Sequence, residues 1–305
     1  MQNNLVTQSN NLVTAAYTMT LREKELLLAC VSRVDSRVDS RVDAEVVNKQ
    51  TKFTVTVQEM KDLFYKETNK DNAFRDLEKA ARSLFHREVE IKLDGNKTLI
   101  TRFISGALFD PDKSQITVTF AEDILPYLTQ LSANFTKYRL IEISELSSIH
   151  AIRLYELIIC WIGQWQYSKT LDLDDFRYVM GVSGKYKQFG QLREYVIDKA
   201  IEEINNNTEY KVSVEYKKVR RSFVTLTLSF HKKSLAKLED KKGKISEDML
   251  SAIVRSKKFE ADYNNYHRLS GEGKRDRDTF RNEMKDFITM YPEDFEKKPL
   301  ENYLK

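Results

Sequence analysis

The two halves of this 305-residue chain carry the same pattern of residues, and this internal repeat restricts the fold more than any other feature. The hexapeptide Leu21-Arg-Glu-Lys-Glu-Leu matches Ile152-Arg-Leu-Tyr-Glu-Leu at an offset of 131 residues. Four apolar residues then recur at an offset of 116: Val57, Met60, Leu63 and Phe64 match Leu173, Phe176, Val179 and Met180. The offsets differ by 15, and three tandem copies of Ser-Arg-Val-Asp between Ser32 and Asp43 account for nearly all of that difference. The sequence therefore predicts two similar domains in tandem, the first with a lengthened surface loop.

Local patterns predict the same order of elements in both copies. The predicted elements of the first copy are a helix over 21–31 that Thr20 can cap, a strand over 53–57, helices over 58–65 and 72–87, and a hairpin with strands over 99–108 and 115–120. Those of the second copy are helices over 151–162 and 189–204 and strands that begin near Val212 and Phe223. Between the copies, residues 121–131 are expected to be helical, and the segment 135–140 joins the halves. This order is typical of a winged helix. The predicted fold class is therefore α+β, with two tandem winged-helix domains and a charged, partly disordered tail after Lys233.

Residues 185–233 combine the features expected of a DNA-binding unit. Apolar residues recur every three or four positions at Phe189, Leu192, Val196, Ala200 and Ile204, which predicts a helix with an outward polar face. Asn205, Asn206 and Asn207 are expected to end this helix. A hairpin follows, with a basic turn predicted at Lys217, Lys218, Arg220 and Arg221. The stretch holds eleven Lys or Arg against six Asp or Glu, although the whole chain has a formal charge of only +4. In a winged helix the helix enters the major groove and the hairpin tip lies on phosphates.

The candidate DNA-contacting residues come from both copies. The second copy contributes Lys185, Tyr186, Lys187, Gln188, Gln191, Arg193, Lys217, Lys218, Arg220 and Arg221. The first copy contributes one outward stripe of the helix over 72–87: Arg75, Lys79 and Arg82. For this stripe a contact with the DNA backbone and a solvated helix face with acidic partners, Asp76 and Glu78, are equal alternatives. A solvated face remains an alternative for Lys185, Lys187 and Arg193 as well, but the nearby charges of the hairpin favour contact with DNA.

Acidic residues farther along the same helix limit the expected contact. Glu194, Asp198 and Glu202 would repel phosphate. Only the first two turns of the helix are therefore expected to approach the duplex.

The distribution of reactive residues argues against an enzyme. The four histidines are far apart in sequence, so no pair suggests the metal site of a nicking enzyme. The stretch Gly181-Val-Ser-Gly is too short to cradle a phosphate, and no Lys-Ser or Lys-Thr follows, which argues against a P-loop ATPase. Asp172, Asp174 and Asp175 could be imagined as a metal cluster, but their place at a strand-to-helix junction favours capping. We expect no catalytic residue, no metal and no cofactor.

Cysteine usage and hydropathy indicate the compartment. Cys30 and Cys160 lie in apolar helical runs without metal-like spacing, so we expect buried thiols in a reduced cytoplasm. No run of eighteen apolar residues occurs, and the first twenty residues lack a basic start followed by an apolar block. The sequence predicts a cytoplasmic protein with no membrane partner and no export signal.

Several stretches resemble the iteron-binding plasmid replication initiators, a family built from two winged helices. In chain order they are Ser9-Asn-Asn-Leu-Val-Thr-Ala-Ala-Tyr-Thr-Met-Thr-Leu-Arg-Glu-Lys-Glu-Leu-Leu-Leu28, Phe135-Thr-Lys-Tyr-Arg-Leu140, Ala151-Ile-Arg-Leu-Tyr-Glu-Leu157 and the segment from Tyr186 to Asn205. The resemblance covers roughly residues 5–233 in the family's order. The tandem loop and the tail lie outside it.

The resemblance implies a non-enzymatic initiator that binds direct repeats (iterons) in double-stranded origin DNA as a monomer. It further implies melting of an adjacent AT-rich segment, recruitment of host replication proteins (the host initiator and helicase), and dimers that repress the protein's own promoter. We accordingly expect an N-terminal winged helix over 1–140 for dimerisation and DNA-backbone contacts, and a C-terminal winged helix over 141–233 for sequence-specific reading. The tail over 234–305 has no assigned role.

A transcriptional regulator with tandem winged helices and no part in replication remains the alternative. Direct repeats beside an AT-rich tract would favour the initiator, whereas a single inverted repeat over a promoter would favour the regulator.

Overall fold

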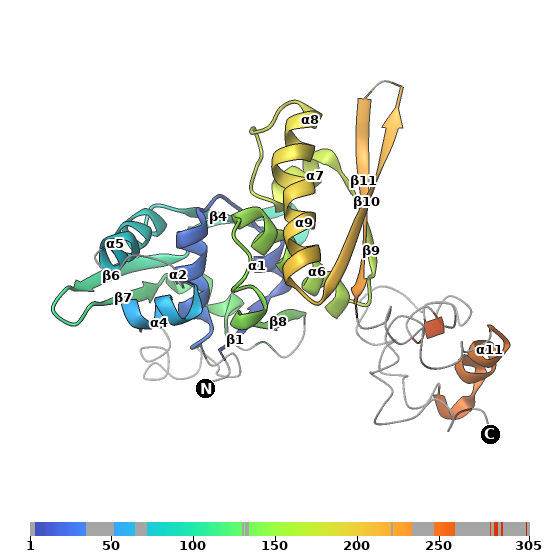
Figure 1. The fold of residues 1–305 in the computed structure, drawn as a ribbon, viewed down its shortest axis with the longest axis horizontal. Helices are drawn as coiled ribbons and strands as arrows, with labels where there is room; N and C mark the ends of the chain where they lie inside the picture. Colours follow the sequence, from blue (N-terminus) through green and yellow to red (C-terminus); the bar gives the residue numbers. More distant parts are fainter. Residues whose placement is uncertain are drawn as a thin grey trace. The chain divides into compact units, whose positions relative to one another are not determined.

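The computed structural model describes residues 4–34, 52–64, 72–129, 131, 134–220, 222–233 and 247–259, and the positions 281, 284, 285, 288 and 303. The chain divides into two compact units, residues 1–208 with 212–229, and residues 209–211 with 230–305. The second and third copies of Ser-Arg-Val-Asp lie outside the described residues. The first predicted winged helix lies within the first unit, and so does the second apart from residues 209–211 and 230–233. Figure 1 shows the fold of the described residues.

The first winged-helix domain places helices against an antiparallel sheet. Its elements are α2 (Leu21–Val31), β3 (Lys52–Thr56), α4 (Val57–Leu63), α5 (Ala73–Leu84), β6 (Ile104–Asp110) and β7 (Gln115–Phe120). The strands lie in the order β3-β7-β6, and Val118 of β7 lies opposite both Phe53 and Ala107. Helix α2 begins with the predicted cap, since Thr20 and Glu23 form a reciprocal capping box. Leu77, Ala81 and Leu84 of α5 are fully buried, as the apolar spacing predicts.

The second winged-helix domain repeats this order. Its elements are α6 (Ile149–Gly163), β9 (Ser168–Asp172), α7 (Leu173–Val179), α8 (Phe189–Leu192), a π-helical segment (Arg193–Asp198), α9 (Lys199–Asn207), β10 (Tyr210–Val219) and β11 (Ser222–Lys232). Helix α8, the π-helical segment and α9 form one continuous long helix. The strand order β10-β11-β9 is the same as β6-β7-β3 of the first domain. The predicted pair of tandem winged helices is confirmed.

Equivalent strands also carry an equivalent hydrogen bond. The Oγ1 atoms of Thr54 and Thr117 lie 2.7 Å apart across β3 and β7, and those of Thr170 and Thr227 lie 2.9 Å apart across β9 and β11. Thr54 and Thr170 are separated by 116 residues, the offset found from the apolar residues. Cross-strand threonine pairs stabilise a sheet through such bonds. The repeat therefore extends from the sequence pattern to individual contacts.

The predicted strand over 99–108 is wrong because Phe103 divides it. Strand β5 (Lys97–Arg102) ends before this residue, and β6 begins after it. Phe103 is only 2% exposed, so the chain turns inward between the strands. Strand β5 pairs with β4 (Glu88–Leu93), which the sequence did not predict, and the sheet order is β2-β4-β5 with β2 at Ala16–Tyr17.

Two helix predictions also need correction. The helix expected over 121–131 is shorter than predicted and is a 3₁₀-helix, Glu122–Tyr127; Pro126 lies inside it and cannot donate the amide hydrogen bond of an α-helix. The helix expected to end at Asn205 continues through Asn207. Asn205 instead binds β10, because its Nδ2 donates to the Val212 carbonyl at 2.9 Å and its Oδ1 accepts from the Val212 amide at 2.6 Å.

The segment expected to join the halves is a strand. Strand β8 (Phe135–Arg139) pairs antiparallel with β1 (Leu5–Ser9), and the short helix α1 (Asn10–Val13) follows β1. Further 3₁₀-helices lie at Asp94–Asn96 and Leu140–Glu142. The N-terminal segment and the connection between the domains thus form one two-stranded sheet.

Buried polar side chains cluster where α6 meets the first domain. Lys24 Nζ lies 2.8 Å from Glu156 Oε2, and Glu156 Oε1 accepts hydrogen bonds from Tyr138 at 2.7 Å and Gln8 at 2.9 Å. Glu156 is fully buried. Burial acts to raise the pKa of Glu156, but Lys24 and Arg153 hold it below its ordinary value, so the carboxylate stays charged. We call the following residues the junction cluster: Gln8, Tyr17, Lys24, Tyr138, Arg153 and Glu156.

The repeat places an Arg–Glu pair three residues apart in both α2 and α6, but the surroundings differ. Arg22 and Glu25 of α2 lie 2.9 Å apart, with the Arg22 side chain 40% exposed and that of Glu25 4% exposed. Arg153 and Glu156 are both buried and 3.7 Å apart. Burial raises the pKa of Glu25 to about 7, although Arg22 opposes this shift. Glu25 therefore binds a proton more tightly in the folded chain than in the unfolded chain.

Replacing Glu25 with glutamine is expected to stabilise the protein above pH 7. The folded pKa lies above the ordinary value of 4.5, so Glu25 weakens the fold progressively as pH rises from about 4.5 to about 7. A shift of this size corresponds to on the order of 3 kcal/mol. Thermal unfolding at pH 5 and pH 8 should show a larger fall in Tm for the parent than for Glu25→Gln. The exposed carboxylate of Glu88, replaced by glutamine, serves as the control. Parallel pH profiles for the parent and Glu25→Gln would contradict this assignment.

Helix α11 (Glu247–Arg255) lies in the tail and was not predicted. Leu250, Ile253 and Val254 are buried at helical spacing. Helix α11 was not predicted because its short apolar stripe lies in a sequence rich in charged residues. Positions 281, 284, 285 and 288 of the tail are also helical.

Candidate nucleic-acid interface

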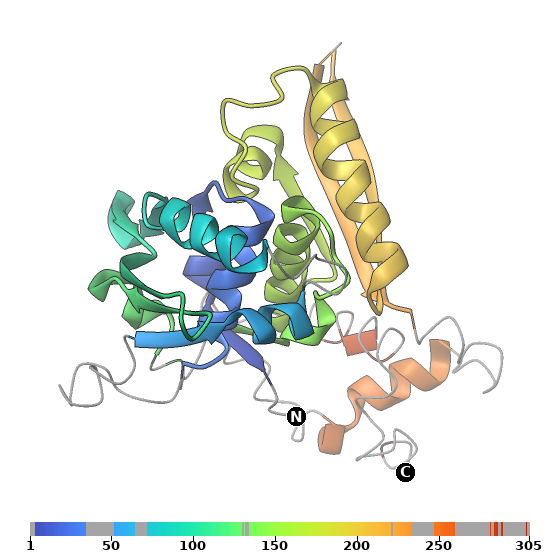
Figure 2. The same cartoon turned by 60° about the vertical axis from the view of Figure 1, so that its left-hand side comes forward.

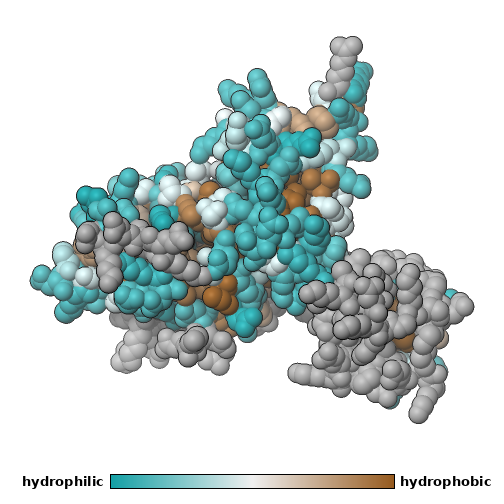
Figure 3. Space-filling model, in the orientation of Figure 1, coloured by the Kyte–Doolittle hydropathy of each residue, from teal (hydrophilic) through white to brown (hydrophobic). Residues whose placement is uncertain are grey.

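The long helix of the second domain presents a polar face along its first turns. Leu192, Val196, Ala200 and Ile204 are fully buried, whereas Gln188, Gln191 and Arg193 are exposed. The predicted apolar stripe from Leu192 onward and the predicted outward face are therefore confirmed. Figure 3 shows hydrophilic residues over this side of the helix.

The π-helical segment explains how that stripe stays on one side. The buried residues Leu192, Val196, Ala200 and Ile204 recur at every fourth position. In an α-helix, each step of four residues would turn the buried stripe by about 40° around the helix axis. A π turn contains more residues than an α turn. The π-helical segment Arg193–Asp198 therefore reduces this drift along the helix.

The hairpin of β10 and β11 runs alongside the long helix (Figures 1 and 2) and is joined to it by aromatic rings. Phe189 stacks on Phe223 with the ring centroids 3.9 Å apart, and Tyr216 meets the two rings edge-on at 5.1 and 5.9 Å. Lys218 Nζ lies 4.3 Å from the centre of the Phe223 ring. Phe189, predicted to face the core, thus packs on the hairpin. These contacts fix the hairpin beside the first turn of the helix.

The basic residues of the hairpin are spread over more than its turn. Lys217 and Lys218 are exposed but lie in β10, so the prediction that they form the turn is wrong. Arg220 is exposed in the turn, with a left-handed backbone φ of 56°. Arg221 lies outside the described residues. The hairpin grows longer than predicted because β10 continues through Val219.

Arg193 contacts a carboxylate of its own helix. Its Nε donates to Asp198 Oδ2 at 3.1 Å, and its guanidinium lies 5.7 Å from the centre of the Tyr216 ring. The two charged side chains are 55% and 46% exposed, so water screens this ion pair and it contributes little to stability. The sequence predicts only that Asp198 repels phosphate. The contact was missed because a spacing of five residues does not bring side chains together in an α-helix, whereas a π turn does.

The loop before the helix carries the remaining basic candidates. Lys185 and Lys187 are exposed, and half-buried Tyr186 adopts a positive φ of 48° between them. The Tyr186 ring stacks on Tyr195 with centroids 6.5 Å apart and meets the His150 ring at 6.2 Å. Burial and then Lys185 lower the pKa of His150, so the imidazole is neutral at pH 7. The positive charge of this loop therefore comes from its lysines.

A basic groove of 870 Å³ lies on the first domain between α5 and β6. Arg75, Lys79 and Arg82 line it and are exposed, as the predicted outward stripe requires. Arg82 donates to Glu78 at 2.7 Å and lies 4.6 Å from the centre of the Phe109 ring. Glu78 thus pairs with one of the three cations, as expected if this stripe is a solvated helix face. Contact of the stripe with the DNA backbone stays a prediction.

Two further residues of this groove were missed from the sequence. His86 follows α5 and Phe109 lies near the end of β6. They come together with the stripe only because β6 folds back over α5. No spacing in the sequence signals that contact.

Other chemistry predicted from the sequence can be placed as follows. Asp172 occupies the N-cap position of α7 as expected, although its side chain makes no capping hydrogen bond.

Cys30 and Cys160 are buried and unpaired, and burial raises the pKa of both thiols. Over the described part of the chain, no group of His, Cys, Asp and Glu is arranged to hold a metal ion. Among the same residues, no helix has the length and apolar character needed to cross a bilayer.

Two family models match the chain in the order of its winged helices. The model described as "Initiator Replication protein, WH1" matches residues 5–159, and the model described as "Initiator Rep protein, WH2" matches residues 172–230. The first match extends into α6, the helix whose Arg153 and Glu156 contact the first domain.

Individual proteins agree with these matches. A replication initiation protein of Escherichia coli is 25% identical over 265 residues, which cover 84% of this chain and 79% of that protein. An uncharacterized 27.6 kDa protein of Escherichia coli is 24% identical over 208 residues, covering 67% and 85% of the two chains. The fold is similar to that of the Pi initiator protein, solved in complex with iteron DNA, with a TM-score of 0.60 at 18% identity; this similarity covers 75% of this chain and 98% of that one. Because the two family models together span most of the chain, the protein belongs to the initiator replication protein family.

Proposed function

We propose that this protein initiates replication of a plasmid by binding direct repeats, or iterons, in double-stranded origin DNA. Family membership supports this role, and the Pi initiator, which shares the fold, was solved with iteron DNA. The observation that carries the proposal is the exposed polar face of the first helical turns beside a cationic hairpin. That pairing provides base-reading side chains and phosphate-binding side chains on one surface.

The two kinds of contact divide between elements of the second domain. Gln188, Gln191 and Arg193 lie where a helix in the major groove would present its side chains to base edges. Lys217, Lys218 and Arg220 on the hairpin would lie along phosphates. The α5 groove of the first domain would take up the backbone of the same duplex.

Further steps belong to the same proposal. The monomer binds the repeats, promotes melting of adjacent AT-rich DNA and recruits the host initiator and helicase, without a catalytic residue or cofactor of its own. A dimer formed through the first domain represses the protein's promoter. Ile100, which lies on the outer strand β5 of the described sheet, is 64% exposed and supports self-association, since apolar residues on an edge strand favour pairing with another chain.

Binding and replication are tested separately. A duplex carrying tandem direct repeats from beside the gene should bind at least about 10³-fold more tightly than a scrambled duplex at physiological salt. A plasmid whose replication depends on that segment should be maintained only when the protein is supplied. Binding confined to an inverted repeat over a promoter, with no maintenance of the plasmid, would contradict the proposal in favour of a transcriptional regulator. A covalent protein–DNA adduct on supercoiled origin DNA would contradict it in favour of a nicking enzyme.

A further inference from the structure

The two winged helices are joined by directional bonds to buried groups. Arg153 of α6 donates from Nη1 to the Tyr17 hydroxyl at 2.7 Å and from Nη2 to the Ala15 carbonyl, both in the first domain. Its Nε donates to the Val179 carbonyl at the end of α7 at 2.8 Å. A single buried side chain thus links β2 of the first domain to the end of α7 in the second.

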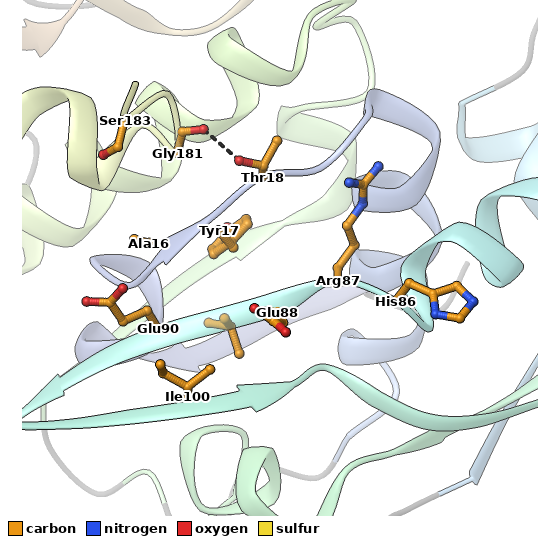
Figure 4. A pocket seen from close by; sticks show the side chains of 11 residues that line it. Ala16, Tyr17, Thr18, His86, Arg87, Glu88, Glu90, Ile100, Gly181 and Ser183 are labelled. Carbon is orange, nitrogen blue, oxygen red and sulfur yellow. Dashed lines mark hydrogen bonds between the residues drawn. The ribbon is translucent and has the colours of Figure 1, made fainter. Parts of the chain in front are cut away.

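A second set of contacts lies next to the first, at the loop that leads into the long helix. Thr18 Oγ1 donates to the Gly181 carbonyl at 2.9 Å (Figure 4). Gly181 has a φ of +66°, and a Cβ atom there would lie 1.8 Å from the Tyr17 carbonyl oxygen. Only glycine allows so close an approach of the two backbones. The loop is therefore fixed to the first domain eight residues before Phe189, where the long helix begins.

A third contact lies between α7 and β4. The Tyr178 hydroxyl lies 3.3 Å from both the carbonyl and the carboxylate of Glu90, and Lys92 Nζ lies 4.1 Å from the centre of the Tyr178 ring. With the junction cluster, these contacts connect the first domain to α6, to α7 and to the following loop. The second domain is thereby restrained against both rotation and translation relative to the first.

The buried polar groups of the junction cluster are better suited to fixing the orientation of the two domains than to stabilising the interface between them. A buried ion pair loses hydration, so apolar side chains of similar volume often stabilise an interface as well or better. An apolar contact, however, tolerates sliding, whereas the carboxylate of Glu156 needs Lys24, Gln8 and Tyr138 at defined positions. Such groups can therefore select one arrangement of the domains.

A fixed arrangement of the two domains limits the spacing of the two DNA segments that they can contact together. The α5 groove and the first turns of the long helix belong to different domains, and a duplex turns once every 10 to 10.5 base pairs. Each inserted base pair would rotate the second contact by about 34° relative to the first. If the domains keep one arrangement, only one spacing of the two contacted segments fits both.

We propose that the junction cluster is a positioning device that sets the base-pair spacing accepted between the DNA segments contacted by the two domains, with Lys24 and Glu156 as its central pair. This inference rests on the proposed binding of repeat DNA. The residues act through the domains that they orient and do not touch DNA.

The test measures affinity for duplexes with altered spacing. The contacted segments of one repeat are first mapped with the full-length protein by hydroxyl-radical footprinting, and one, two or five base pairs are then inserted between them. The parent should lose roughly tenfold or more in affinity with one or two added base pairs, a loss comparable to that from a mismatched base pair. The double variant Lys24→Met with Glu156→Gln removes the two charges of the central pair and keeps similar side-chain volumes, while Arg153 keeps its hydrogen bonds to Tyr17, Ala15 and Val179. It should bind the natural spacing with a small loss and show a several-fold smaller penalty for one or two added base pairs.

A milder variant and a matched control separate positioning from stability. Tyr17→Phe removes the hydroxyl that receives Arg153 and keeps the ring, and it should reduce the spacing penalty in the same direction. Leu226→Ala, a buried change in β11 away from the junction, should lower Tm but retain the parent's spacing profile. Measurements are made at a temperature at which every variant is folded.

Unchanged spacing profiles for both junction variants would overturn the inference and leave the proposed function intact. Failure of the parent to prefer repeat DNA over scrambled DNA would overturn the proposed function, and the inference with it. A relaxed profile in Leu226→Ala as well would also overturn the inference, since lowered stability alone would then explain the effect.

Discussion

Replacing Glu156 with alanine is expected to lower the free energy of unfolding by about 3 to 5 kcal/mol, because it leaves buried cations without their carboxylate. Lys24 is 1% exposed and Arg153 is 2% exposed, so water cannot replace the missing partner. Tyr138 and Gln8 are also deprived of the oxygen to which they donate. The corresponding fall in Tm is roughly 10 °C or more for a folded unit of this size.

The repeat supplies a matched control for this change. Glu25 occupies the position in α2 that Glu156 occupies in α6, but it is paired with a partly exposed arginine and its pKa is raised. Glu25→Ala should therefore destabilise much less at pH 8 than Glu156→Ala. The pH dependence should also have the opposite sign. Since the pKa of Glu156 is lowered, its contribution is present at neutral pH and is lost as pH falls below its ordinary range.

Chemical denaturation at pH 8 measures the decrease in the free energy of unfolding for Glu25→Ala and for Glu156→Ala. Equal decreases for Glu25→Ala and Glu156→Ala would show that the buried cations near Glu156 find other partners. The role assigned to the junction cluster in stability would then be wrong.

The elements that the sequence predicted are those that depend on local spacing. The apolar residues of α5 and of the long helix recur at helical intervals, and Thr20 with Glu23 provides a cap that can be recognised within four residues. The offset of 116 residues predicted equivalent strands and helices, because a repeated pattern of apolar residues must be buried in a similar way. The basic face beside the hairpin followed from the same spacing.

The features that the sequence did not predict depend on distant contacts. Gln8 and Glu156 are 148 positions apart, and the run Arg22-Glu-Lys-Glu has the composition of a solvated helix face. Nothing local shows that Lys24 and Glu25 are buried. The β4–β5 hairpin was missed for a related reason, since a division at Phe103 depends on burial of that ring against other elements. The contact of Arg193 with Asp198 depends on a π turn, which the apolar spacing did not reveal.

Replacing Arg193 with alanine is expected to weaken binding to the repeat and to relax the preference at one or two base positions. Arginine can donate two hydrogen bonds to a guanine edge, and removing them costs about 1 to 3 kcal/mol of discrimination. Binding to scrambled DNA should change less. Replacing Lys217 and Arg220 of the hairpin should instead weaken both kinds of DNA similarly and reduce the salt slope by about one unit for each phosphate that is no longer neutralised.

Asp198 provides the control that isolates the reading role of Arg193. Asp198→Asn keeps the guanidinium and removes the charged partner that it contacts in the free protein at 3.1 Å. Affinity for every duplex should rise, because a negative charge leaves the surface, while the base preference should be retained. Salt titrations of the three variants against the repeat and a scrambled duplex distinguish these patterns. If Arg193→Ala weakens binding to both duplexes in the same proportion as the hairpin variant, Arg193 binds phosphate and the base preference must come from Gln188, Gln191 or the neighbouring loop.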